Sequence, residues 1–138
     1  DHMDVYDLLI CADVIEHIES PYDFLNRLKN RSKYFLFNIP LESNLLTMLK
    51  GYSAVRKSYD SVGHVHFYSP ASAVLLLELA GYEIINKKFS KNRTHHLKTN
   101  LTLKKLAAAL PQYILESISP YLSAILMGDS LVILAKKK

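Results

Sequence analysis

The sequence is poor in cysteine and glycine and has no tryptophan. Its 138 residues contain one cysteine and four glycines. A single cysteine, Cys11, excludes an intrachain disulfide and is typical of a reducing compartment, so we expect a cytoplasmic protein. No two of the four glycines are close enough to form a G-x-G turn. The usual glycine-rich loop for phosphates or dinucleotides is therefore excluded within these residues.

Long hydrophobic runs and a strong charge are also absent. The most apolar stretch, residues 113–135, is interrupted by Glu116, Pro120, Gly128 and Asp129, whereas a transmembrane helix needs about 20 unbroken apolar residues. No charged, apolar and small-residue pattern opens the chain, so we expect no signal peptide. The net charge of +4 favours a solvated basic face over a nucleic-acid or membrane surface.

Length and composition predict one globular domain or part of one. The 138 residues are 49% hydrophobic, which is enough to form a buried core. Residues 1–3 have the character of a cloning remnant. Residues 4–138 are assigned to the fold, with a helical insertion at about residues 99–127.

Hydrophobic periodicity predicts a strand–helix–strand unit near the start. Residues 5–12 contain an unbroken apolar run from Leu8 to Ala12 and are expected to be a strand. Ser20 is a suitable N-cap and Pro21 suits the first helical position. Residues 33–39 alternate and contain aromatic side chains, so they are expected to form a second strand. A helical crossover between two strands implies that the strands are parallel.

The next segment, residues 41–68, has a weaker pattern. A short helix is expected near residues 45–49, and the polar stretch after Gly51 is expected to be a long irregular loop. Ser69 then begins a helix that ends at Gly81.

The second half of the chain is expected to contain two more strands, at residues 82–89 and 130–135. Between them, Pro111 and Pro120 should divide the apolar insertion into separate short helices. The insertion could serve as a lid, an acceptor pocket or a membrane-surface element. We favour a fourth interpretation, in which it covers a bare face of the sheet.

The run from Tyr6 to Ile18 is the most informative feature. An apolar strand stops at Asp13, and Glu16 and His17 follow within one helical turn. In open α/β sheets the functional groups lie just past the carboxyl ends of the strands. The sequence therefore predicts a functional site at this turn.

Five short motifs resemble, in order, the second half of class I S-adenosylmethionine-dependent methyltransferases, in particular the small-molecule branch with the ubiquinone-biosynthesis enzymes. The motifs are D-V-I-E-H at 13–17, S-P at 20–21, N-I-P at 38–40, G-H-V-H-F-Y-S at 63–69 and A-G-Y at 80–82. The resemblance covers residues 4 to about 89 and resumes at 128–136. It implies an α/β fold with a partial Rossmann-like sheet of about four strands. The strands should be mostly parallel, with the last inserted antiparallel between the second and third.

The resemblance also implies a function for the parent protein, which is methyl transfer from S-adenosylmethionine to an unidentified small-molecule acceptor. In the family, this segment contacts the methionine end of the cofactor at positions that match Cys11, Ala12, Asp13 and Val14. The family's glycine-rich turn and ribose-binding acid are absent here. We therefore expect the 138 residues alone to bind the cofactor weakly and to be inactive. Two other hypotheses are a non-catalytic interaction domain of the same fold and an unrelated nucleotide-binding half-domain.

Asp13, Glu16, His17 and His64 are candidate ligands of a divalent metal, with His66 as a substitute for His64. Positions i, i+3 and i+4 share one face of a helical turn, and carboxylates are ligands of hard divalent ions. The set resembles the metal site of small-RNA 2′-O-methyltransferases. The alternative, which we favour, is that Glu16 and His17 brace the turn without a metal.

His64 and His17 are the candidate general bases, because imidazole titrates near neutral pH. In an extended loop His64 and His66 would point to opposite sides, and we assign His64 to the pocket. Self-association is expected through residues 5–12, since a first strand left at the edge of the sheet would carry no charge or proline between Leu8 and Ala12.

Overall fold

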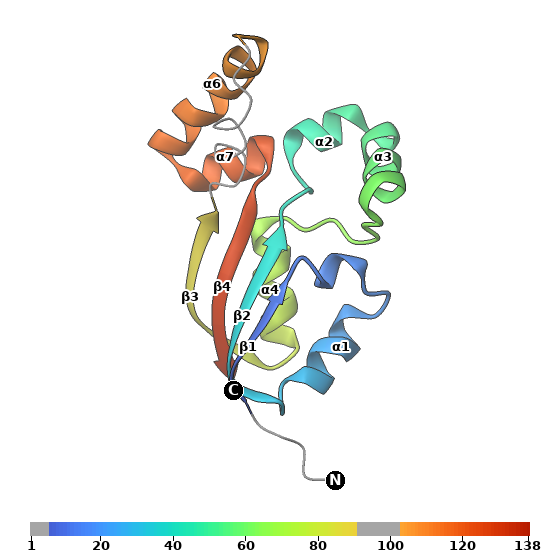
Figure 1. Ribbon diagram of the computed structural model, residues 1–138, viewed down its shortest axis with the longest axis vertical. Coiled ribbons are helices and arrows are strands. Elements are labelled where there is room, and N and C mark those ends of the chain that lie inside the picture. Colours follow the sequence, from blue (N-terminus) through green and yellow to red (C-terminus); the bar gives the residue numbers. More distant parts are fainter. Residues whose placement is uncertain (1–5, 91–102) are drawn as a thin grey trace.

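The computed structural model describes residues 6–90 and 103–138 (Figure 1). The interpretation of residues 1–3 and the expected start of the insertion at residues 99–102 lie outside the described residues. In chain order the elements are β1 (Tyr6–Ala12), η1 (Ile15–His17), α1 (Pro21–Leu28), β2 (Ser32–Pro40), α2 (Leu45–Lys50), α3 (Tyr52–Val62), α4 (Pro70–Leu79), β3 (Tyr82–Ser90), α6 (Leu103–Ile118), α7 (Pro120–Met127) and β4 (Ser130–Lys137).

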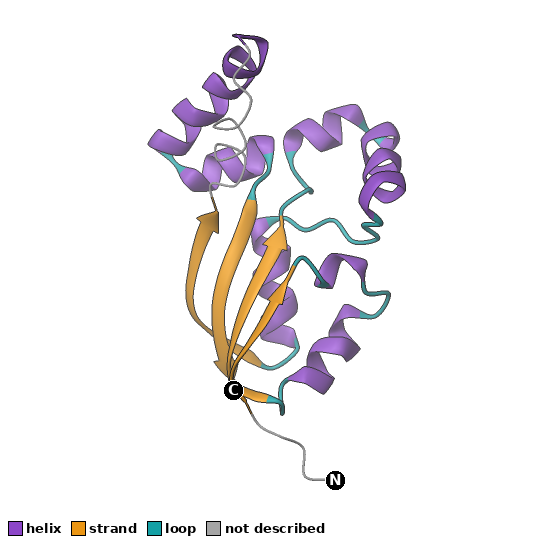
Figure 2. Ribbon diagram, in the orientation of Figure 1, coloured by secondary structure: helices purple, strands orange, loops and turns teal. Residues whose placement is uncertain are grey.

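The four strands form one mixed sheet in the order β1-β2-β4-β3 (Figure 2). β1 and β2 are parallel, with Ile10 opposite Leu36. β4 runs antiparallel to both of its neighbours, and Leu36 also lies opposite Leu134. The predicted α/β fold is therefore confirmed, including the insertion of the last strand between the second and third.

The core lies between one face of the sheet and the helices α1 and α4. Phe35 and Phe37 of β2 stack on each other, and both rings meet the Tyr82 ring edge to face. The Tyr82 hydroxyl donates a 2.8 Å hydrogen bond to the Leu25 carbonyl of α1. All four side chains are fully buried. This contact fixes α1 on the sheet, and α1 follows the turn that carries the predicted site.

The opposite face of the sheet is exposed on the β1 side. Tyr6, Leu8 and Ile10 of β1 are 48–64% exposed, and Tyr34 of β2 is 47% exposed. The prediction that the insertion covers this face is wrong. α7 instead contacts α2, α4 and β3, so the two insertion helices lie at the end of the sheet (Figure 1).

The segment after Gly51 is a helix rather than the expected irregular loop. α3 has no buried residue, which is why the hydrophobic pattern gave no signal for it. It is supported by a 2.9 Å ion pair between Arg56 and Asp60, four residues apart. Gly63 ends the helix in the left-handed conformation with φ of 76°.

The prolines and caps of the remaining helices agree only in part with expectation. Ser69 caps α4 through a reciprocal capping box with Ser72, whereas Ser20 precedes α1 without a side-chain hydrogen bond. Pro120 begins α7 as expected, but Pro111 lies inside α6. An interior proline removes its own backbone N–H from the helical ladder and crowds the carbonyl four residues before it, so Pro111 weakens α6 without ending it. None of the described helices has the length and apolar character that crossing a membrane would require.

Candidate functional site

The turn after β1 is fixed by a backbone conformation that few residues adopt. Asp13 has φ of 52°, the single positive φ among the described non-glycine residues. Its N–H donates to the Asn38 carbonyl at 3.1 Å, and the Asn38 amide donates to the Asp13 carboxylate at 2.9 Å. The two carboxyl ends of β1 and β2 are therefore joined at the predicted site. Strained backbone of this kind is enriched at functional sites.

Glu16 is a buried carboxylate beside this turn. Its side chain is 0% exposed, and neither carboxylate oxygen has a hydrogen-bond partner among the described residues. Burial is the main cause that raises the pKa of Glu16 above its usual value. The Glu16 backbone carbonyl accepts hydrogen bonds from the N–H groups of Val65 and His66, at 2.9 and 3.1 Å. These bonds hold residues 63–69, the histidine loop, against the turn.

His64 lies between two carboxylates. Its Nε2 atom is 3.8 Å from Glu16 Oε1, and its Nδ1 atom is 2.9 Å from Glu42 Oε2. The Ser58 hydroxyl donates to the same Glu42 oxygen at 2.8 Å. The His64 side chain is only 11% exposed. The imidazole is therefore oriented by a carboxylate that is itself held in place by a hydroxyl.

His17 completes the cluster. Its Nδ1 atom lies 3.1 Å from the Gly63 carbonyl, and its Nε2 atom lies 3.9 Å from Glu16 Oε1. The rings of His17 and His64 meet edge to face with centroids 4.8 Å apart. Glu16, His17 and His64 each offer one ligand atom, and these three atoms lie within 4.8 Å of one another.

The structure does not bring Asp13 or His66 into this group of three. Asp13 precedes the helical turn, which begins only at Ile15, and its left-handed backbone breaks the assumed helical spacing. The His66 ring lies 3.3 Å from the Glu19 carbonyl.

The positions expected to contact the cofactor lie at the carboxyl end of β1. Ala12 and Asp13 are exposed, and Val14 is half-buried. Cys11 is 4% exposed, and burial raises the pKa of its thiol to about 11. A contact at the Cys11 position would therefore come from the backbone.

Sequence reasoning missed Glu42 and Ser58. Glu42 lies two residues past the end of β2, and functional groups collect at the carboxyl ends of strands, so its position could have identified it. Ser58 lies on α3, whose helical character the sequence did not reveal.

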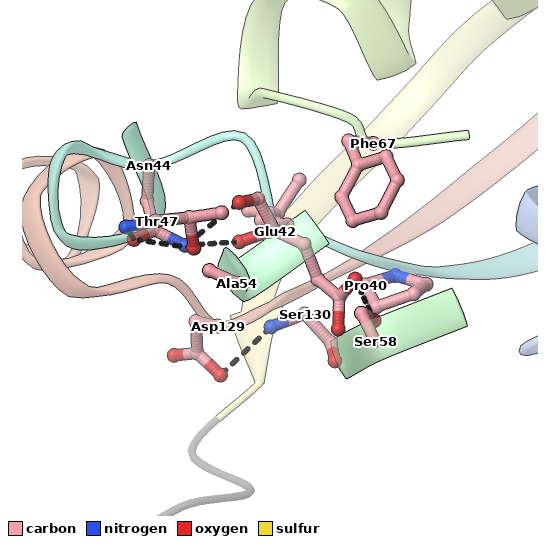
Figure 3. Close-up of a pocket in the computed structure, with 10 residues that line it drawn as sticks. Pro40, Glu42, Asn44, Thr47, Ala54, Ser58, Phe67, Asp129 and Ser130 are labelled. Carbon is pink, nitrogen blue, oxygen red and sulfur yellow. Dashed lines mark hydrogen bonds between the residues drawn. The ribbon is translucent and has the colours of Figure 1, made fainter. Parts of the chain in front are cut away.

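Two hollows adjoin the Glu42–His64 pair. The first, of about 250 Å³, is lined by the end of β2, by α2 and α3, by Phe67 and by the turn before β4 (Figure 3). The second, of about 320 Å³, is lined by His64, Phe67, Val65 and residues of α3. Glu42 lines the first and His64 lines the second, so the pair lies between them.

Comparison with known protein families matches residues 2–87 to a methyltransferase domain. These residues include β1, the turn, the histidine loop and most of β3. No curated protein matches the sequence.

Solved structures of methyltransferase-like enzymes have a similar fold. The magnesium protoporphyrin IX methyltransferase from Synechocystis, with bound SAH, matches 98% of this chain and 46% of its own, at 14% identity and a TM-score of 0.52. A cyclopropane synthase from Mycobacterium tuberculosis matches 98% of this chain and 56% of its own, at 13% identity and a TM-score of 0.59. A SAM-dependent methyltransferase from Archaeoglobus fulgidus matches 98% of this chain and 61% of its own, at 20% identity and a TM-score of 0.55. The chain thus spans about half the length of these relatives.

Proposed function

The chain belongs to the methyltransferase-domain family, and from this premise we propose that it forms part of a site that transfers a methyl group from S-adenosylmethionine to a small-molecule acceptor. The observation that carries the proposal is the turn at Asp13, where a strained backbone and a carboxylate follow the end of β1. The Glu42–His64 pair lies beside the same edge of the sheet.

We propose that the residues after β1 hold the methionine end of the cofactor. That end carries an ammonium group, which suits an exposed carboxylate such as Asp13. Asn38 holds the Asp13 side chain at 2.9 Å, so little side-chain entropy is lost on binding. The cofactor, when bound, supplies the electrophilic methyl group. The residues present fit its methionine end, and no glycine-rich turn among the 138 residues fits its adenosine end.

His64 is the proposed general base, and His17 supports it by ring contact. With its Nδ1–H donated to Glu42, His64 has a lone pair on Nε2 that can accept the acceptor's proton. Glu42 acts as a positioning residue that fixes the tautomer. The remaining contribution of the protein is to hold the two reactants in line.

The 138-residue chain by itself should bind S-adenosylmethionine only weakly, because contacts to one end of a ligand provide a small part of its affinity. Calorimetric titration of this chain is expected to show no saturation up to about 1 mM, a binding free energy weaker than about −4 kcal/mol. A dissociation constant in the micromolar range would show that these residues hold the whole cofactor. The proposal that they hold only its methionine end would then be wrong.

A divalent metal at Glu16, His17 and His64 is the second candidate. It is favoured by the buried Glu16 carboxylate, which has no hydrogen-bond partner among the described residues, and by the closeness of three ligand atoms. A metal bound there would polarise an acceptor hydroxyl and lower its pKa. A histidine that binds a metal through Nε2 is not a free base, so the two roles of His64 are alternatives. A chelator should lower the activity only if His64 binds a metal.

Self-association through β1 is a third expectation, linked to the interaction-domain hypothesis. β1 is an edge strand, and its outer face exposes Tyr6, Leu8 and Ile10. Such edges pair with other strands unless a charge or proline blocks them. We expect sedimentation at tens of micromolar to show a dimer. Ile10→Lys should make it a monomer, whereas Leu79→Lys on the exposed side of α4 should leave the dimer intact. A wild-type monomer at these concentrations would contradict the expectation.

A further inference from the structure

Helices α2 and α3 contain no buried residue, although they carry many large apolar side chains. Figure 1 shows both helices beyond the carboxyl ends of β1 and β2. The apolar side chains of the two helices that are at least 36% exposed, which we call the α2–α3 patch, are Leu45, Leu46, Met48, Leu49, Tyr52, Val55, Tyr59 and Val62. A soluble protein rarely exposes so large an apolar surface unless a partner covers it.

The α2–α3 patch is continuous rather than scattered. On α3 its members recur every three or four residues, which places them on one side of the helix. On α2 the side chains of Met48 and Leu49 are 71% and 74% exposed. Because α2 contacts α3, the apolar residues of the two helices adjoin and form one surface.

The surface around the patch carries positive charge. Lys50 on α2 and Lys57 on α3 are exposed, and neither forms an ion pair with a residue in the described ranges 6–90 and 103–138. Asp60 is the one acidic residue of the two helices, and Arg56 already contacts its carboxylate at 2.9 Å. The two lysines are therefore left to attract negative groups outside the protein.

A small ligand would leave much of the patch in water. Tyr52, Val55 and Tyr59 line the 320 Å³ hollow described above, so a molecule bound there would cover them. Met48 and Leu49 do not line that hollow. Only an extended surface covers both sets of residues. Aliphatic side chains combined with tyrosines and lysines are typical of helices that lie in the headgroup region of a membrane.

We propose that the α2–α3 patch docks the protein on an anionic phospholipid membrane. Its apolar side chains enter the boundary between headgroups and acyl chains, while Lys50 and Lys57 reach the lipid phosphates. Both helices lie along the membrane surface rather than across it. The net charge of +4 did not indicate this contact, because the exposure of these apolar side chains is visible only in the fold. The docking does not depend on the proposed methyl transfer.

Flotation of the 138-residue chain with lipid vesicles tests the docking. The vesicles are either pure phosphatidylcholine or phosphatidylcholine with about one third of anionic phosphatidylglycerol. At low salt we expect at least tenfold tighter binding to the anionic vesicles, since each lysine near such a surface contributes about fivefold. Salt at about 0.5 M should remove most of the difference, because it shortens the screening length to about 4 Å. No binding to either vesicle, or equal binding to both at low salt, would overturn the proposal.

The double variant Met48→Ser and Leu49→Ser tests the apolar contact. Both side chains are largely exposed, so the melting temperature should stay unchanged while binding to anionic vesicles weakens at least tenfold. The matched control is Leu75→Ser with Leu79→Ser on α4, where the side chains are 53% and 63% exposed, and it should change binding less than twofold. Equal losses in both variants, or a changed oligomeric state with unchanged vesicle binding, would overturn the proposal.

The double variant Lys50→Gln and Lys57→Gln tests the charge. It should weaken binding to the anionic vesicles at least tenfold and leave binding to the neutral vesicles unchanged. The matched control is Lys87→Gln with Lys88→Gln, which removes the same charge from exposed positions of β3 and should change binding less than threefold. Equal losses in the two variants would reduce the effect to net charge and would contradict docking through α2 and α3.

Discussion

Replacing His64 by glutamine is expected to lower the rate of methyl transfer by about 100- to 10,000-fold, the usual contribution of a general base. The amide of glutamine can still contact Glu42 but cannot take up a proton. The measurement is transfer of tritium from methyl-labelled S-adenosylmethionine to a small-molecule extract, catalysed by the natural polypeptide that contains these residues. Cofactor affinity should be unchanged, because the effect is confined to the chemical step.

Two companion variants separate the base from its surroundings. Glu42→Gln removes the carboxylate that orients His64 at 2.9 Å and should lower the rate about tenfold, with a changed pH profile. His66→Gln is the matched control, because this ring contacts only a backbone carbonyl by hydrogen bond, and it should keep at least half of the rate. If His64→Gln retained more than a tenth of the wild-type rate, His64 would not be the base.

If Glu16, His17 and His64 form a metal site, Zn²⁺ should raise the melting temperature of the chain by about 10 °C at pH 7.5. At a metal concentration about 100 times the dissociation constant, binding adds roughly 2.7 kcal/mol to the free energy of unfolding. Each kcal/mol corresponds to about 3–4 °C in a domain of this size. Carboxylate and imidazole bind metals when deprotonated, so the increase should vanish as the pH falls through about 6.

Glu16→Gln separates the metal from the charge. It should abolish the increase with Zn²⁺, while His66→Ala and Asp13→Asn should retain it. Without metal, burial places the pKa of Glu16 higher in the folded chain than in the unfolded chain. Wild-type stability should therefore fall as the pH rises from about 4.5 through the folded-state value, and the glutamine variant should be the more stable at pH 7.5. Equal responses of wild type and Glu16→Gln to Zn²⁺ would contradict the site.

Strong local patterns made most of the sheet predictable. β1 contains an unbroken apolar run from Leu8 to Ala12, and β2 and β4 carry apolar residues that face the core. The antiparallel place of β4 followed from the family resemblance rather than from periodicity, since the hydrophobic pattern of a strand does not identify its partner strands. Helix α3 could not be predicted because it buries no side chain, and helical signal in a sequence comes chiefly from an apolar stripe.

Those residues of the candidate site that belong to a recognisable sequence motif could be predicted. Glu16, His17 and His64 were found because motifs mark them, and the structure places their ligand atoms within 4.8 Å. Asp13 was expected on the same helical face, but no sequence rule foretold its left-handed backbone. Glu42 and Ser58 meet His64 only through tertiary folding, 22 and 6 residues away in the chain. Such contacts require the fold to be known first.

In the proposed function, the carboxyl end of β1 holds the methionine end of the cofactor. Hydrogen–deuterium exchange of the natural polypeptide, with and without S-adenosylhomocysteine, tests this claim without knowledge of the acceptor. We expect slower amide exchange at residues 11–14 on binding, and at least tenfold weaker binding by Asp13→Ala. Binding that leaves the exchange of residues 11–14 unchanged, with full affinity in Asp13→Ala, would mean that the carboxyl end of β1 does not hold the cofactor.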